Sequence, residues 1–292
     1  MRVRTTLFTC AVAATAVLLT VPSLIAQQGA GRGRTGGAPQ APAGPAPRLS
    51  NGKPDLSGLW ANPYTPNMAA PGRVLDPKTR QPLKFARQGE KLADAVDPAR
   101  TFDLPFTEWG LKHWKGYDPV GKGDYAGNCL PFGMPRNINS PHGVQIIHHP
   151  DALAFLFEQN TWHHWVSTSA SFKWPSDLPE TWNGVSTGRW EGDTLVIETR
   201  GFNGYTKLDT NGHPHSKEMV LTNTFTRTDA RTMEHTIMVH DPKAYTQDWM
   251  NVRTWRIKPA PDVLMEYSCE ENNLHNILDG AIKIWQAPED LD

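Results

Sequence analysis

The feature that most constrains the fold is a period-two alternation of apolar and polar side chains between residues 143 and 269. The alternation runs through short segments separated by turn formers, and Glu191-Gly192-Asp193 is one such turn. Alternation is typical of strands that turn one face to a core, and short connections between consecutive strands indicate antiparallel pairs. The segments therefore predict a meander of antiparallel strands.

Nine strands are expected after residue 142, and one more before it, near Trp60. The later strands are expected at 143–149, 153–158, 161–169, 184–190, 194–200, 219–228, 232–240, 249–257 and 263–269. An exposed strand edge invites pairing with other chains, and closing the sheet removes it. We therefore expect a mainly β fold, either an antiparallel up-and-down barrel or a strongly curved sheet.

Residues 61–128 lack this alternation and are expected to form an irregular cap over the sheet. Two stretches within it, 84–96 and 106–117, have apolar residues at helical spacing, although Gly89 weakens the first. A single all-β domain of this size is ordinary, so residues 54–292 are expected to fold as one domain.

Residues 1–26 predict a cleavable export signal. Two arginines among the first four residues precede an uncharged, largely apolar stretch that ends at Ala26, which is typical of a secretory signal peptide. A retained membrane anchor is the alternative, although Pro22 interrupts the apolar run. Residues 27–53, dominated by Gly, Ala, Pro and Gln, indicate a disordered tether. We therefore expect a periplasmic or secreted protein without stable membrane insertion after signal removal.

Removal of the signal leaves two cysteines, Cys129 and Cys269. Disulfides persist in exported proteins, so we expect these two to be bonded, with two separate buried thiols as the alternative. Arg136 follows the first cysteine closely. It could clamp a carboxylate or a hydroxyl-rich ligand, or it could form an ion pair with Glu270 or Glu271.

Two resemblances are carried by particular blocks of sequence. Gly58-Leu59-Trp60 resembles the G-x-W opening of lipocalins, which implies a barrel with an internal ligand cavity. A second set of blocks resembles an uncharacterised family of exported proteins from environmental bacteria. These blocks are CLPFGMPR (129–136), GRWEGDTLVIETRGFN (188–203), TNGHPHS (210–216), DPKAYT (241–246) and YSCEENN (267–273). This resemblance covers most of the chain and implies no activity, and residues 157–165 depart from the family pattern.

Polar side chains on the apolar faces of the predicted strands are candidates for a site. They are Asn223, Arg227, His235 and Glu266. Each would cost roughly 1–3 kcal/mol if buried without a partner, so they should meet one another or a ligand. One hypothesis is a polar patch in a ligand cavity, with His235 and Glu266 as an acid/base pair. The other is an internal hydrogen-bond network that satisfies itself.

Residues 209–215 form the sharpest local cluster of titratable side chains. His213 and His215 flank a proline that restrains their separation, and Asp209 could orient one imidazole. At a barrel mouth this loop could supply a general base or hold a metal, although the sequence points to no third metal ligand. Because the loop also contains the turn formers Asn, Gly and Pro, a plain turn is the alternative.

Tryptophan is unusually frequent, with 11 residues in the chain. Its broad ring stacks on sugars, aromatic rings and terpenoids, so some of these residues are expected to line a pocket while the rest form an aromatic core. The pocket candidates are Trp109, Trp114, Trp162, Trp174 and Trp182. Along strand 161–169, Trp162 and His164 point to one face, while His163 and Trp165 point to the other. Trp162 and His164 are therefore ligand-binding candidates, with cross-strand packing as the alternative.

These observations favour an exported binding module that holds a small organic ligand such as a sugar, an aromatic compound or a terpenoid. The formal net charge is −1, so nothing indicates nucleic acid as the partner. The chain has no Gly-rich phosphate loop, H-E-x-x-H or C-x-x-C-H motif, and we expect no cofactor. One alternative is a structural envelope protein. The other is a hydrolase, lyase or isomerase with an acid/base set of Asp209, His213, His215, His235 and Glu266.

Overall fold

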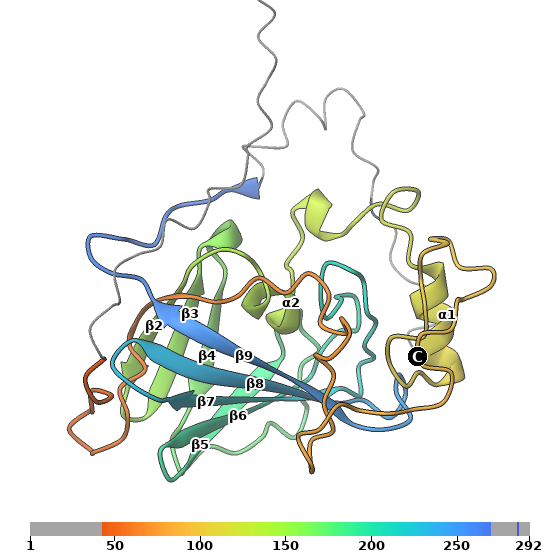
Figure 1. Cartoon of the computed structure of the whole chain (residues 1–292). Coiled ribbons are helices and arrows are strands. Elements are labelled where there is room, and N and C mark those ends of the chain that lie inside the picture. The colour runs from red at the N-terminus through yellow and green to blue at the C-terminus, as the bar shows by residue number, and fades with distance from the viewer. Residues whose placement is uncertain (1–42, 270–284, 286–292) are drawn as a thin grey trace, which may run out of the picture. The chain divides into compact units, whose positions relative to one another are not determined.

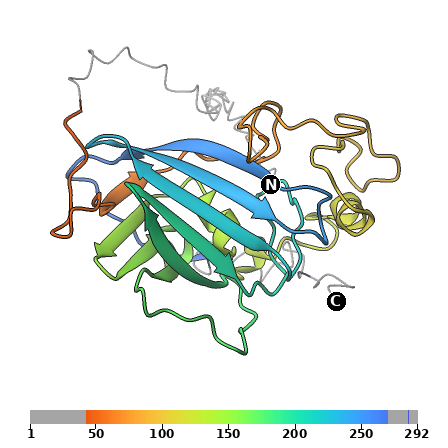
Figure 2. The same cartoon turned by 90° about the horizontal axis from the view of Figure 1, so that it is seen from below.

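Nine strands of the described residues close into a barrel in chain order, as Figures 1 and 2 show. The computed structural model describes residues 43–269 and Trp285, so the predicted signal peptide lies outside the described residues. The strands are β1 (Gly58–Ala61), β2 (Val144–His149), β3 (Ala152–Phe157), β4 (His163–Ser167), β5 (Val185–Glu191), β6 (Thr194–Arg200), β7 (Val220–Arg227), β8 (Thr232–His240) and β9 (Trp249–Ile257). The expected mainly β barrel is confirmed.

Closure is made by β1, which pairs with β2 on one side and with β9 on the other. Neighbouring strands are antiparallel with one exception, because β4 and β5 run parallel, with Val166 opposite Ser186. The connection between them, residues 168–184, is long enough to return along the barrel wall. The tight turns that join β5 to β6 and β7 to β8 allow only antiparallel neighbours. The expectation of a purely antiparallel meander therefore fails at this pair.

The predicted tenth strand, residues 263–269, is not a strand. Because β1 and β8 occupy both edges of β9, no edge remains there for another strand. Glu266 is exposed to solvent, whereas His235 is fully buried on β8. The predicted acid/base pair of His235 and Glu266 is therefore wrong, because the alternation in 263–269 does not continue the sheet.

The cap contains one of the two helices expected in it. The helix α1 (Glu108–Gly116) confirms the second prediction, and Thr107 caps it by accepting a hydrogen bond from the backbone N–H of Gly110 at 3.1 Å. Residues 84–96 form turns instead, and Arg87 and Asp94 lie in the left-handed region with φ of 64° and 61°. Among the described residues, no helix is long and apolar enough to cross a membrane.

Three further short helices lie around the barrel. They are η1 (Ala126–Asn128), α2 (Met134–Ile138) and η2 (Gln159–Thr161). The α2 helix is buried throughout, and Figure 1 shows it near the end of the barrel. Its position brings Asn139, the residue that follows it, into the barrel interior described below.

Large apolar side chains fill the barrel interior. Trp60, Phe155, Phe225 and Trp255 are fully buried there, and cap residues such as Met68 join the same cluster. Strand β7 alternates strictly between half-buried and buried positions, which places Asn223 on the inner face beside Phe225. The alternation expected from the sequence therefore describes these strands correctly.

The expected disulfide joins Cys129 to Cys269 across 140 positions of sequence, and this prediction is confirmed. The bridge ties the segment after β9 to the segment that follows η1. Of the predicted tether, residues 43–53 are described and they contact the barrel. Arg48 binds the carboxylate of Asp193 through both terminal nitrogens, at 2.9 and 2.6 Å.

Candidate functional site

A buried polar network extends from the cap into the barrel interior. Its members are Asp103, Asn139, Asp209, His213, Asn223, His235, Asn251 and Arg253, and all but Asp103 are almost fully buried. Backbone groups link its two halves. Met68 donates its N–H to Asp209 and accepts a hydrogen bond from Asn251, while Asn139 donates to the carbonyl oxygen of Leu208.

The outer half of the network is built on the loop that follows Lys207. Asp209 accepts backbone hydrogen bonds from Gly212 (3.0 Å) and His213 (3.2 Å) with one oxygen, which shapes the turn. Its other oxygen lies 2.8 Å from Nδ1 of His213 and 2.7 Å from the backbone nitrogen of Met68. The structure therefore brings Asp209 and His213 together, and the carboxylate orients the imidazole.

His213 lies between two carboxylates. Its Nε2 is 3.6 Å from Oδ2 of Asp103, and its ring stacks on Trp114 with 4.3 Å between ring centres. Burial alone would lower the pKa of His213, but Asp209 and Asp103 outweigh it and raise that pKa to about 9. An imidazole that is already protonated near neutral pH has no lone pair with which to take a proton. His213 is therefore unsuited to act as a general base.

The charge on His213 predicts a stability that depends on pH. Because its pKa in the folded chain, about 9, lies above the ordinary 6.5, its contribution is complete below about pH 6.5 and is lost as the pH rises through about 9. We expect the excess unfolding free energy of the wild type over His213→Gln to fall by roughly 3 kcal/mol across that interval. Urea unfolding of both proteins at several pH values measures it. A constant difference would mean that His213 is neutral when folded.

His215, two residues further on, makes separate contacts. Its Nδ1–H donates to the carbonyl oxygen of Ser216 at 3.0 Å, and its Nε2 accepts from the hydroxyl of Thr206 at 2.6 Å. Burial lowers the pKa of His215 to about 4, so it is neutral with both nitrogens engaged. Among the described residues, no three His, Cys, Asp or Glu side chains converge on a metal position.

The inner half of the network lies on three adjacent strands. His235 donates from Nε2 to Oδ1 of Asn223 at 2.9 Å, and it stacks on Phe225 with 4.3 Å between ring centres. Burial, reinforced by the nearby charge of Arg253, holds the pKa of His235 well below its ordinary value. His235 is therefore a neutral core histidine, and no group in the described part of the chain forms a hydrogen bond with its Nδ1.

Arg253 is a member of the network that sequence reasoning missed. It lies opposite His235, and its guanidinium donates to the side-chain oxygens of Asn139 and Asn251. Burial lowers the pKa of Arg253 to about 9, with Arg73 acting in the same direction and Asp209 opposing. The sequence did indicate this position, because the alternation of a strand places Arg253 on the same face as Trp255, which is the inner face.

Four other predicted site residues lie elsewhere. His164 is buried with Nε2 2.6 Å from the hydroxyl oxygen of Ser186, and burial lowers its pKa to about 4. Trp162 is partly buried against the barrel core. Arg227 donates to the backbone oxygens of Asp55 and Ala230, which attaches the start of the domain to β7. These contacts of His164, Trp162 and Arg227 are all internal to the protein.

Arg136, the fourth, forms a bidentate ion pair with Asp124, at 2.9 and 2.7 Å. Its guanidinium also lies over the rings of Tyr125 and Phe132, 5.0 Å from each centre. The predicted alternative, a pair with Glu270 or Glu271, lies outside the described residues. Arg136 is thus held by an internal carboxylate that sequence reasoning did not identify.

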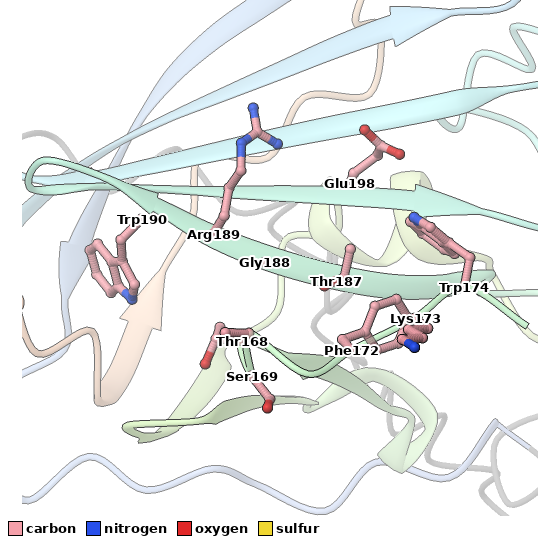
Figure 3. A pocket seen from close by; sticks show the side chains of 11 residues that line it. Thr168, Ser169, Phe172, Lys173, Trp174, Thr187, Gly188, Arg189, Trp190 and Glu198 are labelled. Carbon is pink, nitrogen blue, oxygen red and sulfur yellow. The ribbon is translucent and has the colours of Figure 1, made fainter.

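A pocket of about 500 Å³ lies on the outer wall of the barrel and shares no residue with the buried polar network. Its wall is formed by strands β5 and β6 and by the connection that follows β4. Figure 3 shows Trp174 and Phe172 at one end of the pocket and Trp190 at the other. The remaining lining residues are Thr168, Ser169, Ala170, Lys173, Thr187, Gly188, Arg189 and Glu198.

Trp174 lies at one end of this pocket. Its ring meets that of Phe172 edge-on at 5.3 Å, and the guanidinium of Arg200 lies 5.3 Å from its centre. Arg200 also binds Glu198 at 2.7 Å. Trp174 is one of the five tryptophans predicted as pocket candidates, whereas Trp109, Trp114, Trp162 and Trp182 do not line this pocket.

Comparisons of the chain with protein-family models, with curated proteins and with solved structures found no match.

Proposed function

We propose that the protein is an exported binding protein whose outer-wall pocket holds a small hydroxylated ring compound, with sugars as the main class. The observation that carries the proposal is the lining of this pocket, in which three aromatic side chains lie among hydroxyl, carboxylate and basic side chains. A volume of about 500 Å³ is that of an ordinary small-molecule site. The predicted signal peptide and the disulfide between Cys129 and Cys269 support export.

The lining favours hydroxylated ligands over terpenoids. The ring of Trp174 offers a flat surface for the apolar face of a ligand. Arg189 and Lys173 can donate hydrogen bonds to a ligand, and Glu198 can accept them. The hydroxyls of Thr168 and Thr187 already donate to backbone oxygens, so they remain available as acceptors. A ligand without polar groups would displace water from these side chains and replace none of their hydrogen bonds, which is unfavourable. A sugar, which carries both donors and acceptors, satisfies them.

Binding is better supported than acid/base catalysis. The pocket contains one carboxylate, that of Glu198, which is engaged by Arg200 at 2.7 Å. Hydrolysis of a glycosidic bond generally needs two carboxyl groups that face each other across the bond. The histidines of the predicted catalytic set are all buried, and each has partners within the protein. The pocket therefore has the means to hold a sugar but lacks the usual pair for cleaving one.

Truncating Trp174 is expected to weaken binding at least about tenfold, because the ligand loses its stacking surface. A panel of monosaccharides and disaccharides, screened by thermal shift on the purified protein, identifies a ligand through the rise in melting temperature. Isothermal titration then compares the wild type with Trp174→Ala. Trp165→Ala is the matched control, because Trp165 is 60% exposed on β4 and does not line the pocket.

Two results would contradict the proposal. One is the absence of any thermal shift with the whole panel. The other is equal affinity in the wild type and in Trp174→Ala for a sugar that does bind, which would place the sugar elsewhere on the protein.

A further inference from the structure

Lys207 is a buried lysine whose ammonium group has no hydrogen-bond or ion-pair partner in the part of the chain that the structure describes. The residue is 6% exposed. Its backbone is held in place, because its N–H donates to the hydroxyl of Tyr125 at 3.1 Å and it forms an isolated bridge with Pro214. Buried charges are normally paired, since desolvation penalises them strongly. A lysine that is largely buried, and whose ammonium is paired with no carboxylate of the described residues, therefore needs an explanation.

An aromatic neighbour of this ammonium, Tyr117, carries a hydroxyl group that makes no hydrogen bond to the described residues. Nζ of Lys207 lies 5.8 Å from the ring centre of Tyr117. The hydroxyl oxygen of Tyr117 is buried, and no described residue forms a hydrogen bond with it. The ring is packed so closely on Gly212 that a Cβ atom there would overlap it, so the tyrosine is fixed in position. Tyr117 thus presents its ring to the ammonium and also carries a hydroxyl, and neither of these two donors has an acceptor among the described residues.

The charges around Lys207 are mainly positive. Arg100 lies 5.3 Å from the centre of the Tyr117 ring, and its guanidinium donates to backbone oxygens of α1. Arg136 lies nearby and is paired with Asp124. Two guanidinium groups and one carboxylate therefore act on Lys207, and the two cations oppose its charge. This surplus of positive charge attracts an anion.

We propose that Lys207 and Tyr117 form a binding site for the carboxylate or phosphate group of a small molecule. Such a group accepts hydrogen bonds from the ammonium and the hydroxyl through different oxygens, and it neutralises the surplus charge. The site is separate from the outer-wall pocket, with which it shares no residue. It is a second ligand site, and its existence does not depend on sugar binding.

The site has a predictable pH dependence. Burial, together with Arg100 and Arg136, lowers the pKa of Lys207 to about 8 against the opposing effect of Asp124. The titratable and charged groups around Lys207 and Tyr117 are Tyr125, Asp124, Asp209, Arg100, Arg136 and His215. Burial raises the pKa of Tyr117 above its ordinary value, so its hydroxyl keeps its proton. Anion affinity is therefore expected to fall as the pH rises through about 8.

Thermal shift and isothermal titration with inorganic phosphate and with acetate test the site, with chloride at equal ionic strength as the reference. We expect phosphate, acetate or both to raise the melting temperature near neutral pH and to lose the effect well above pH 8. Lys207→Met keeps the length of the side chain but removes the donor, and it should abolish the shift. Tyr117→Phe removes only one oxygen and should weaken binding several-fold. Lys91→Met, at an exposed lysine, should bind as the wild type does.

Three outcomes would overturn the proposal. They are a shift no larger than that with chloride, undiminished phosphate or acetate binding by Lys207→Met, and an affinity that does not change between neutral and alkaline pH. The comparison of phosphate with acetate identifies which anionic group is preferred. Because Trp174→Ala should bind both anions normally, failure of sugar binding and failure of anion binding can be told apart.

Discussion

Replacing Asp209 with asparagine is expected to lower the free energy of unfolding by about 3–5 kcal/mol, the usual effect of removing one partner from a buried ion pair. Asp209 is fully buried and accepts hydrogen bonds from Met68, Gly212 and His213. Asparagine keeps the size of the side chain but removes the charge. The imidazolium of His213 then loses its nearer carboxylate, while the more exposed Asp103 at 3.6 Å compensates only in part.

Equilibrium urea unfolding measures the loss, and a double-mutant cycle with His213→Gln isolates the pair. Because removing both partners leaves no uncompensated buried charge, the double variant should be less destabilised than the sum of the single changes. Asp193→Asn serves as the control for loss of a carboxylate in an ion pair, because the pair of Asp193 with Arg48 is exposed and should contribute little. If Asp209→Asn proved as stable as the wild type, the pair would not carry opposite charges in the folded protein.

The second large effect concerns the disulfide. Changing Cys129 and Cys269 together to serine is expected to destabilise the protein by about 4–5 kcal/mol in the chain-entropy model, since the bridge closes a loop of 140 residues. The bridge also anchors the segment that carries Tyr125, the residue whose hydroxyl accepts the backbone N–H of Lys207. Reduction should therefore weaken the proposed anion site as well as the fold.

Urea unfolding of the oxidised wild type, the reduced wild type and the double serine variant tests this prediction. The last two should coincide, and a reducing agent should have no further effect on the serine variant. Equal stability of the oxidised wild type and the serine variant would show that the unfolded chain gains little freedom when the bridge is absent.

Much of the fold could be predicted because it depends on neighbouring residues. The alternation along β7 and β8 placed Asn223 and His235 on the inner face, where both are fully buried. The same pattern was misleading in 263–269. Alternation predicts the face to which each side chain of a strand points. A segment becomes a strand of the sheet only if a neighbouring strand has an unpaired edge for it. Closure of β1 on β9 leaves none, and Glu266 lies exposed.

The candidate sites depended more on tertiary structure. His213 and Asp209 are four residues apart, and the sequence alone placed them in one loop. The charge of His213 also depends on Asp103, which comes from a different segment of the chain. Arg253 is likewise bound by Asn139, 114 positions away. No local sequence pattern indicates contacts between residues that are so far apart in the chain. The sequence could therefore identify candidate titratable residues but could not assign their protonation states.

The sequence by itself predicted strands β1–β9 and favoured the disulfide, because alternation and residue type are local properties of the chain. Only the tertiary structure decided that β4 and β5 run parallel, which leaves the long connection with Trp174 against the outer wall and forms the pocket there. It also decided that the ammonium of Lys207 lies over the ring of Tyr117 and is paired with no carboxylate of residues 43–269. The physical reason is that burial and electrostatic environment are properties of groups brought together from distant parts of the chain.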